Sequence, residues 1–494
     1  MSKIKVNIFA NYFGVIITTA LSFLVVPFYL RFLGKDAFGL VGIASLIQGW
    51  IMLLNSGLAP VTGREAAKAY SGSSDWNKAA FFFRTVDIFL IFLSCIVFIV
   101  FIIISKPLSM MWIKSNTLDN QTIVLALCLL VVMTLFRLLT SVTRGILINI
   151  EMQVWLNNNL ILFSLLRFAA SIPLLYFYPH VNLLFAWWLI ISITEYLTVQ
   201  RKVWNTIPYK IKLFSFDFNS LRQQWKIISA LASTSLIWVL ITNMDKLILS
   251  THLTLEDYGF YSITVLLSGG IIILAQPIAQ AFQPRMTSAF SSEGVIQAEK
   301  ILENATHWIV YLIFPIVMVL CFYPQQIIYI WTGNVEASRQ AGNLLPGYTF
   351  GNVFIALGSI LYAFQVSVGV VRKHLQGNIL LCVCYLPLLP ITVSKYGALG
   401  VSLLWAGINI LYFVFWNLHL LKSVTVTLYP KWIFRDCLLP LCVNVCIIYL
   451  VQYYVPLSHF GSRINLSFQL CILGLVVFIL NFAYMRLIQI RLFR

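Results

Sequence analysis

The sequence is poor in charged residues. Only 10% of its 494 residues are charged, whereas 60% are hydrophobic. A soluble globular chain carries about 25% charged residues, so this composition excludes a soluble protein. The apolar residues instead fall in runs of roughly 18–27, the length that crosses a bilayer as a helix. The sequence therefore predicts an integral membrane protein.

Several functional motifs are also missing. No GxxxxGK[ST] pattern is present, which excludes nucleotide hydrolysis by a P-loop. The nine cysteines form no CxxC pair and the six histidines are scattered, so we expect no metal centre, redox centre or cofactor. The predicted outer loops are no longer than roughly 15–20 residues, and no Asp/Glu/His cluster suggests a glycosyltransferase site. We therefore expect no catalytic residues and a protein that is not an enzyme.

Acidic residues are half as frequent as basic ones, 16 against 33, which gives a net charge of +17. Nucleic-acid binding does not explain this excess, because the basic residues lie between apolar runs, as the positive-inside rule requires. With the N-terminus in the cytoplasm, about 23 Lys/Arg lie on the cytoplasmic side and about 7 outside. Residues 201–226 form the decisive basic segment. An even number of spans then returns the C-terminal arginines, up to Arg494, to the cytoplasm.

We predict an all-α polytopic fold with about fourteen transmembrane helices, because backbone in lipid must satisfy its own hydrogen bonds. The predicted spans are 8–32, 40–62, 79–105, 122–148, 156–178, 181–200, 226–251, 258–284, 305–331, 344–371, 375–393, 397–420, 434–455 and 466–488.

A weak internal repeat divides these spans. Asp-Ala-Phe-Gly at 36–39 opens the second span, and Glu-Asp-Tyr-Gly at 256–259 opens the eighth, about 220 residues later. This predicts two six-helix bundles, 1–200 and 226–421, joined by a basic linker at 201–225. Six spans per half give both halves one orientation, related by a pseudo-two-fold axis along the membrane normal. Residues 422–494 add helices 13 and 14 outside the repeat.

Charges within spans are the sharpest functional signal, because lipid penalises each by at least about 2.5 kcal/mol near its centre. Arg137, Thr140, Ser141 and Arg144 share one helical face. Similar polar stripes on the other early spans predict an aqueous cavity in the first half. The stripes comprise Asn11, Thr18 and Ser22 in the first span, Ser45, Gln48 and Asn55 in the second, Arg84, Asp87 and Ser94 in the third, Asn157, Ser164, Arg167 and Ser171 in the fifth, and Ser192, Glu195 and Lys202 in the sixth.

Two interpretations of these residues stay open. Arg137, Arg144 and Arg167 suit an anionic head group such as a pyrophosphate, because guanidinium donates bidentately to phosphate oxygens. In this interpretation Asp87, Glu195 and Asn55 complete a substrate-binding site. Alternatively, the arginines pair with Glu195 and Asp87 only to hold the bundle together.

Asp245 and Lys246 form a second group of charges in the seventh span. Adjacent residues point about 100° apart on a helix, so the two do not share a face. One interpretation makes them an ion-coupling site that drives transport. The other is a charge pair near the outer end of the span, partly snorkelling to the interface.

The N-terminal motifs resemble a known family. The N-terminal region of sequences in that family is similar to Asn-Tyr-Phe-Gly at 11–14, Pro-Phe-Tyr-Leu-Arg-Phe-Leu-Gly at 27–34, Phe-Gly-Leu at 38–40, Gly-Leu at 57–58 and Arg-Glu at 64–65. These motifs look like polysaccharide transporters, including the Wzx-type O-antigen flippases of the multidrug/oligosaccharidyl-lipid/polysaccharide exporter superfamily. They cover about 60 residues, and the two-half plan extends the likeness along the chain.

The resemblance implies a flippase of the bacterial inner membrane that works by alternating access. Its cargo would be an undecaprenyl-pyrophosphate-linked oligosaccharide repeat unit, moved to the periplasmic leaflet. Membrane lipid, a polysaccharide polymerase and a chain-length regulator are the implied partners. The sister lipid II flippases carry arginines within helices 1, 2 and 8, which these spans lack at mid-depth, so lipid II is a poor candidate for the cargo.

Three alternatives remain. A cation-coupled multidrug exporter of the same superfamily would need acidic residues in its cavity, whereas this one bears arginines. A membrane polysaccharide polymerase or ligase would need a larger outer loop. A purely structural scaffold would need no buried charge.

Overall fold

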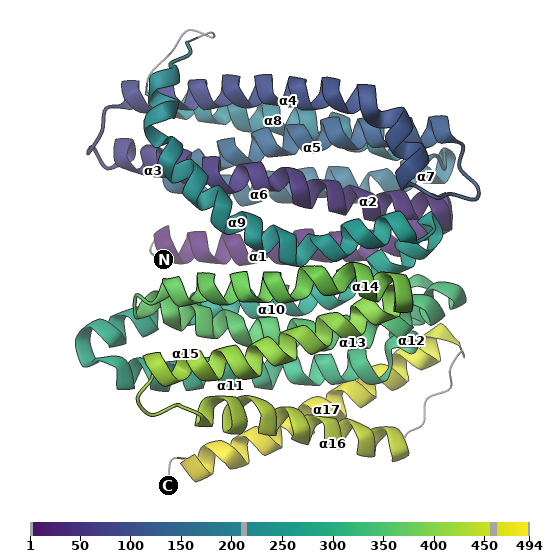
Figure 1. Cartoon of the computed structure of the whole chain (residues 1–494), viewed down its shortest axis with the longest axis vertical. Coiled ribbons are helices and arrows are strands. Elements are labelled where there is room, and N and C mark those ends of the chain that lie inside the picture. The colour runs from purple at the N-terminus through teal and green to yellow at the C-terminus, as the bar shows by residue number, and fades with distance from the viewer. Residues whose placement is uncertain (1–2, 209–214, 455–461, 493–494) are drawn as a thin grey trace. The chain divides into compact units, whose positions relative to one another are not determined.

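The computed structural model describes residues 3–208, 215–454 and 462–492, with side chains from Asn11 to Met485 outside the gaps. Their regular structure is helical (Figure 1). The elements are α1 (Lys3–Leu33), α2 (Lys35–Ile51), η1 (Met52–Leu54), α3 (Asn55–Tyr70), α4 (Trp76–Trp112), α5 (Asn120–Asn149), α6 (Gln153–Ser164), η2 (Leu165–Ala169), α7 (Ser171–Phe177), α8 (Val181–Thr206), α9 (Phe218–His252), α10 (Leu255–Glu293), α11 (Val295–Phe322), α12 (Pro324–Thr332), α13 (Val335–Ser367), α14 (Val371–Leu411), η3 (Tyr412–Trp416), α15 (Asn417–Val424), η4 (Trp432–Leu438), α16 (Leu439–Tyr454) and α17 (Arg463–Leu492).

Several helices begin at a short polar residue that caps their free backbone N–H groups. The Asp75 carboxylate accepts from the backbone N–H of Asn77 at the start of α4, at 3.0 Å. Asp119 accepts from the N–H and hydroxyl of Thr122 at the start of α5, and these bonds lower the pKa of Asp119 below its usual value. These caps place the helix starts in the loops between apolar runs, where the hydropathy pattern predicts them.

The predicted fold class is confirmed, because the described residues contain thirteen helical segments long and apolar enough to span a bilayer. The segment Val371–Val424 has 54 residues and covers the predicted spans 375–393 and 397–420. A straight helix of that length would reach about 80 Å, whereas the hydrocarbon core is about 30 Å thick. The helix breaks at Gly397 (φ 58°, ψ −150°), where the ribbon folds back on itself in Figure 1. Two spans therefore share this segment.

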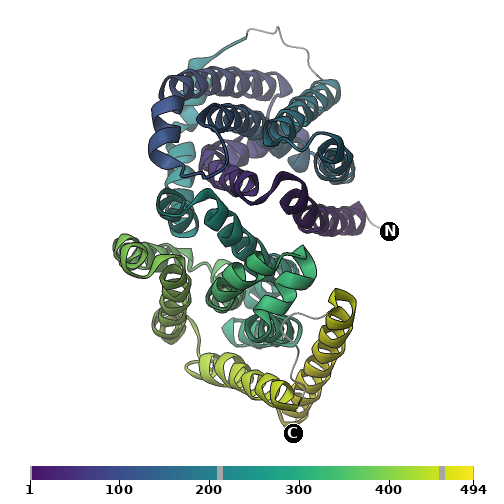
Figure 2. The ribbon, with the colours of Figure 1, turned by 90° about the vertical axis from the view of Figure 1, so that its right-hand side faces the viewer.

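The chain forms two compact units, residues 1–259 and 260–494. In the first unit α5 is the central helix and packs against α8, α3, α4, α2 and α6. The neighbouring helices run along one common direction, which Figure 2 shows end-on. An apolar core of residues such as Leu58, Phe83, Leu139 and Val199 joins α3, α4, α5 and α8. This packing fixes α5 and α8, the two helices that carry most of the mid-span charge.

Asp36 fixes one end of the first unit. Its side chain is only 5% exposed. The carboxylate accepts hydrogen bonds from the Ser115 hydroxyl, the backbone N–H of Asn116, and the N–H and hydroxyl of Thr117, at 2.7–3.2 Å. Because a buried carboxylate needs such donors, Asp36 holds the connection between α4 and α5 against α2.

In the second unit, α16 and α17 pack against α11 at the edge of the bundle (Figure 2). The Asn481 side chain donates to the backbone oxygens of Val310 and Tyr311 at 3.3 and 3.2 Å. The Asn444 amide donates to Asn481 at 2.9 Å. These polar contacts attach helices 13 and 14 of the sequence prediction to the bundle by bonds that lipid cannot replace.

Two parts of the sequence prediction stay predictions. The division into 1–200, 201–225, 226–421 and 422–494 rests on the repeat, which differs in kind from the contact-based division at Gly259. The membrane orientation rests on the distribution of basic residues along the chain. Three of these residues, Lys210, Lys212 and Arg494, lie outside the described residues.

Candidate functional site

A polar cavity of about 150 Å³ lies inside the first unit, between α2, η1, α5, α6, η2 and α8. Its lining comprises Gln48, Met52, Thr134, Arg137, Thr140, Ser141, Arg144, Leu160, Arg167 and Glu195. Half of these residues come from α5, where the polar ones follow the i, i+3, i+4 and i+7 spacing of one helical face. Arg137, Arg167 and Glu195 lie near the middle of their spans, which places the cavity near mid-membrane.

One carboxylate at this cavity serves two arginines. Glu195 Oε1 accepts from Arg144 Nη2 at 2.5 Å, and Glu195 Oε2 accepts from Arg167 Nη2 at 2.7 Å. Arg167 also donates to the Ser192 hydroxyl at 3.2 Å. Glu195 and Arg167 are 5% and 6% exposed, so these bonds are shielded from bulk water. Glu195 thus fixes the positions of two guanidinium groups that come from different helices.

Arg137 has a different partner. It donates to the side-chain oxygen of Gln48, and no carboxylate among the described residues forms an ion pair with it. Three guanidinium groups therefore face one carboxylate, which leaves two positive charges. The Nε atoms of Arg144 and Arg167 are buried and have no hydrogen-bond partner in the described residues. Because buried charges and donors are normally matched, this excess of positive charge is unusual for ion pairs that only hold helices together.

An irregular helical turn positions Arg167. Residues 165–169 form a π-helical turn, in which the backbone N–H of Ala170 donates to Leu165 O, five residues earlier, at 3.0 Å. Pro173 follows one turn later, and its ring nitrogen cannot donate to the Ala169 carbonyl. Such turns are frequent at functional sites. This one directs Arg167 towards Ser192 and Glu195 of α8.

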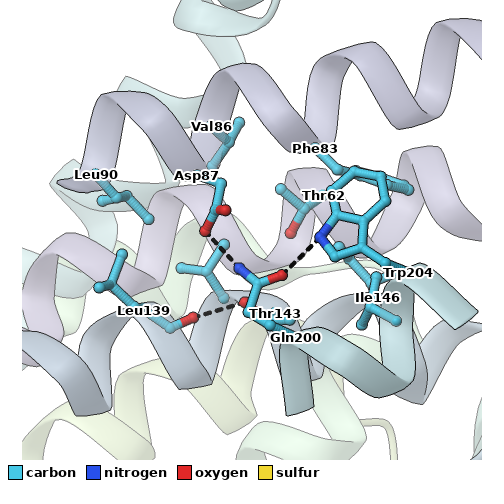
Figure 3. A pocket seen from close by; sticks show the side chains of 12 residues that line it. Thr62, Phe83, Val86, Asp87, Leu90, Leu139, Thr143, Ile146, Gln200 and Trp204 are labelled. Carbon is cyan, nitrogen blue, oxygen red and sulfur yellow. Dashed lines mark hydrogen bonds between the residues drawn. The ribbon is translucent and has the colours of Figure 1, made fainter. Parts of the chain in front are cut away.

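Asp87 belongs to a separate network, and Figure 3 shows the part of it that contains Gln200 and Trp204. Its carboxylate accepts from Tyr196 Oη at 3.0 Å, Gln200 Nε2 at 2.6 Å and Arg84 Nη1 at 3.2 Å. Trp204 Nε1 donates in turn to the Gln200 oxygen at 2.9 Å. Asp87, Gln200 and Trp204 line a space of only about 20 Å³ among mostly apolar side chains. This geometry fits a link between α4 and α8 better than contact with a ligand.

Four of the six predicted binding residues line the cavity, namely Arg137, Arg144, Arg167 and Glu195. Asn55 lies behind the lining, where its amide donates to the Ser141 hydroxyl at 2.7 Å. Asp87 lies outside it. The binding roles of all six stay predictions.

Asp245 and Lys246 lie on α9 and do not line the cavity. Asp245 is 3% exposed, and Lys246 Nζ donates to Asn243 Oδ1 at 3.0 Å. α2 packs closely here, because a Cβ atom on Gly49 would stand 2.7 Å from that same Asn243 oxygen. Their ion-coupling role also stays a prediction.

Sequence reasoning missed three polar partners. Asn159 accepts from Arg144 Nη2 at 3.4 Å, and Tyr196 and Gln200 hold Asp87. Tyr196 and Gln200 are spaced i and i+4 on α8, next to the stripe of Ser192 and Glu195, so a wider stripe would have included them.

Comparison with known proteins gives the chain a family. A family model described as "Polysaccharide biosynthesis protein" matches residues 29–335, which is more than half of the chain. The chain belongs to this family. The matched residues include the whole lining of the arginine cavity. Membership of the polysaccharide biosynthesis protein family confirms the resemblance seen in the N-terminal motifs.

Relatives and solved structures agree with this assignment. A Shigella flexneri protein named "Putative O-antigen transporter" is 25% identical over 418 residues, which cover 82% of this chain and 94% of the relative. The lipid II flippase MurJ in an inward closed conformation has a TM-score of 0.71 at 15% identity, over 98% of this chain and 99% of that one. An inward-facing MATE-family multidrug resistance transporter of the MOP superfamily has a TM-score of 0.66 at 16% identity, over 83% and 96%.

The two solved structures share the fold with this polysaccharide biosynthesis family member, and at such identities they show the fold alone. Together with the thirteen span-length helices, the comparisons identify a multi-pass membrane protein of a transporter fold.

Proposed function

We propose that the protein is a flippase that moves an undecaprenyl-diphosphate-linked oligosaccharide repeat unit, of O-antigen or a similar surface polysaccharide, across the bacterial inner membrane. The direction is from the cytoplasmic to the periplasmic leaflet, with both termini in the cytoplasm. The family and the Shigella relative support a polysaccharide-related cargo. A polysaccharide polymerase and a chain-length regulator are the proposed protein partners, and they would act on the unit after it is flipped.

The observation that carries the proposal is the cavity with three arginines and one carboxylate. A site with two excess positive charges in a low-dielectric environment attracts an anion and repels an organic cation. Its volume of about 150 Å³ is below the roughly 300–1,000 Å³ of sites for drug-sized ligands. The cavity therefore suits the diphosphate of the cargo, and the sugars must lie outside it.

Translocation follows from alternating access around this fixed mid-membrane site. The arginines bind the diphosphate by bidentate, charge-assisted hydrogen bonds. The isoprenoid tail stays in the bilayer, because its transfer to water would cost about 0.8 kcal/mol per CH₂. A change in access then exposes the head group to the opposite side.

The test is a deletion strain analysed for lipid-linked intermediates by leaflet. We expect surface polysaccharide to disappear while single repeat units accumulate on the cytoplasmic leaflet. Accumulation on the periplasmic leaflet would instead identify a polymerase or ligase. Retained polysaccharide together with greater sensitivity to organic cations would identify a multidrug exporter.

A further inference from the structure

We propose that Glu195 sets the charge of the arginine cavity at +2 and thereby selects a dianionic diphosphate diester over phosphate groups of other charge. This inference rests on the proposed function, because it assigns the ligand of the same site. Glu195 acts here as a positioning residue that works through the arginines.

The geometry shows why one carboxylate has this effect. Glu195 contacts only terminal nitrogens, one on Arg144 and one on Arg167. The Nε atoms of both arginines are buried and have no hydrogen-bond partner in the described residues. Arg137 has an uncharged partner, Gln48, so its positive charge is not neutralised.

A purely structural cluster would look different. Buried ion pairs that only hold helices together usually leave little unmatched charge, because an unpaired buried ion is costly. The Arg84–Asp87 pair of the same unit follows this rule, with one carboxylate for one guanidinium group at 3.2 Å. The cavity, by contrast, has two more positive charges than negative charges.

The two excess positive charges of the cavity match one class of phosphate-containing ligand. A diphosphate esterified at both ends, to a polyprenol and to a sugar, keeps one ionised oxygen on each phosphorus and carries two negative charges. It neutralises the cavity while Glu195 keeps its place. A monophosphate diester carries one negative charge and leaves one positive charge unmatched. The terminal phosphate of a free polyprenyl diphosphate loses its second proton with a pKa near 6. Above that pH this ligand carries three negative charges, which is one more than the cavity neutralises.

Glu195 therefore rejects ligands on both sides of the correct charge. Replacing it by glutamine raises the cavity charge to three and moves the optimum to a trianion. Replacing it by aspartate keeps the charge and shortens the reach to the two guanidinium groups. The two substitutions separate the charge of Glu195 from its shape.

The experiment measures binding of three probes to the purified full-length protein in nanodiscs at pH 8. The probes are a polyprenyl-diphosphate-linked N-acetylglucosamine, a polyprenyl-monophosphate-linked glucose and a free polyprenyl diphosphate. We expect the wild type to bind the first probe at least tenfold more tightly than the other two. We expect E195Q to favour the free diphosphate over the diester by about tenfold, and E195D to keep the wild-type order.

Glu299→Gln is the matched control. Glu299 is a fully buried carboxylate of the second unit that accepts from the backbone N–H groups of Val426 and Thr427, far along the chain from the cavity. The control should keep the wild-type order of affinities. Size-exclusion profiles and thermal midpoints of all variants confirm folding.

The outcomes separate the two proposals. If the wild type prefers the diester and E195Q weakens all three probes equally, Glu195 is structural and the inference is wrong. If the wild type binds none of the three probes, the proposed function itself is wrong.

Discussion

Gly39 and Gly259 lie in backbone contact near the starts of α2 and α10. A Cβ atom on Gly259 would stand 3.2 Å from the nitrogen and 3.3 Å from the Cα atom of Gly39. A Cβ atom on Gly39 would stand 2.0 Å from the backbone oxygen of Leu255. The two glycines occupy the same position of the motif that occurs at 36–39 and 256–259, so the copies of this motif meet each other.

Replacing Gly39 by alanine should destabilise the protein. The Leu255 backbone cannot move away easily, because its N–H donates to Lys114 O at 2.7 Å. Overpacking of this kind costs about 1–3 kcal/mol. The thermal midpoint of the purified protein in detergent measures the effect.

Gly269 offers the control for this substitution. It lies in α10, and a Cβ atom added there would have no neighbouring atom within 4 Å, so Gly269→Ala should be neutral or stabilising by up to about 1 kcal/mol. Equal midpoints for the two alanine variants would contradict the backbone contact at Gly39.

Arg137 should be needed for transport and not for stability. Because no described carboxylate pairs with it, Arg137→Gln leaves no counter-ion unpaired, and it removes a charge that burial disfavours. We expect an unchanged or raised thermal midpoint and at least a tenfold loss of flipping, measured with a fluorescent lipid-linked sugar in proteoliposomes. Arg137→Lys keeps the charge and should retain part of the activity. A variant that loses stability and activity together would show that Arg137 is structural.

Arg167 should be needed for both transport and stability. Arg167→Ala removes one of the two partners of Glu195, at 2.7 Å, while Arg144 stays in place. Breaking a buried ion pair costs about 3–5 kcal/mol of stability. Because Arg144 still pairs with Glu195, the loss for Arg167→Ala should lie near the lower of these values or below it. A double-mutant cycle with Glu195→Ala measures the coupling free energy. Additive losses of the two single variants would mean that the bond contributes nothing.

Asp245 should couple transport to an ion gradient if its predicted role holds. Asp245→Asn should then abolish gradient-driven uphill transport while energy-independent exchange across the liposome membrane continues. Lys246→Gln, one residue along α9, is the companion variant, because Lys246 bonds to Asn243 on the same helix. Loss of exchange as well as uphill transport in Asp245→Asn would indicate a packing role.

Much of the fold could be predicted from hydropathy, because each span must bury its own backbone bonds in lipid. The paired spans at Gly397 illustrate this: two apolar runs predicted two helices, although Val371–Val424 forms one uninterrupted segment apart from the turn at that glycine. The periodicity of α5 likewise placed Arg137 and Arg144 on one face, where the structure has them.

The partners of the charges were harder to predict. Arg144, Arg167 and Glu195 come from three different spans, and sequence spacing gives no information on which rotation of each helix brings them together. Asp87 was grouped with the cavity arginines because it has the opposite charge, yet its ion pair is with Arg84, and Tyr196 and Gln200 hold it away from the cavity. Helix rotation and depth depend on packing between helices, which a single sequence does not record.

The π-helical turn before Ala170 has a consequence for the history of the site. Its five-residue hydrogen-bonded ring holds one residue more than the α-helical ring it replaces. A single-codon insertion into an ordinary helix can produce such a turn, because the wider ring absorbs the extra residue and the residues on either side keep their helical faces. Family members with a regular α-helix here should therefore align with a one-residue gap between Ser164 and Ser171.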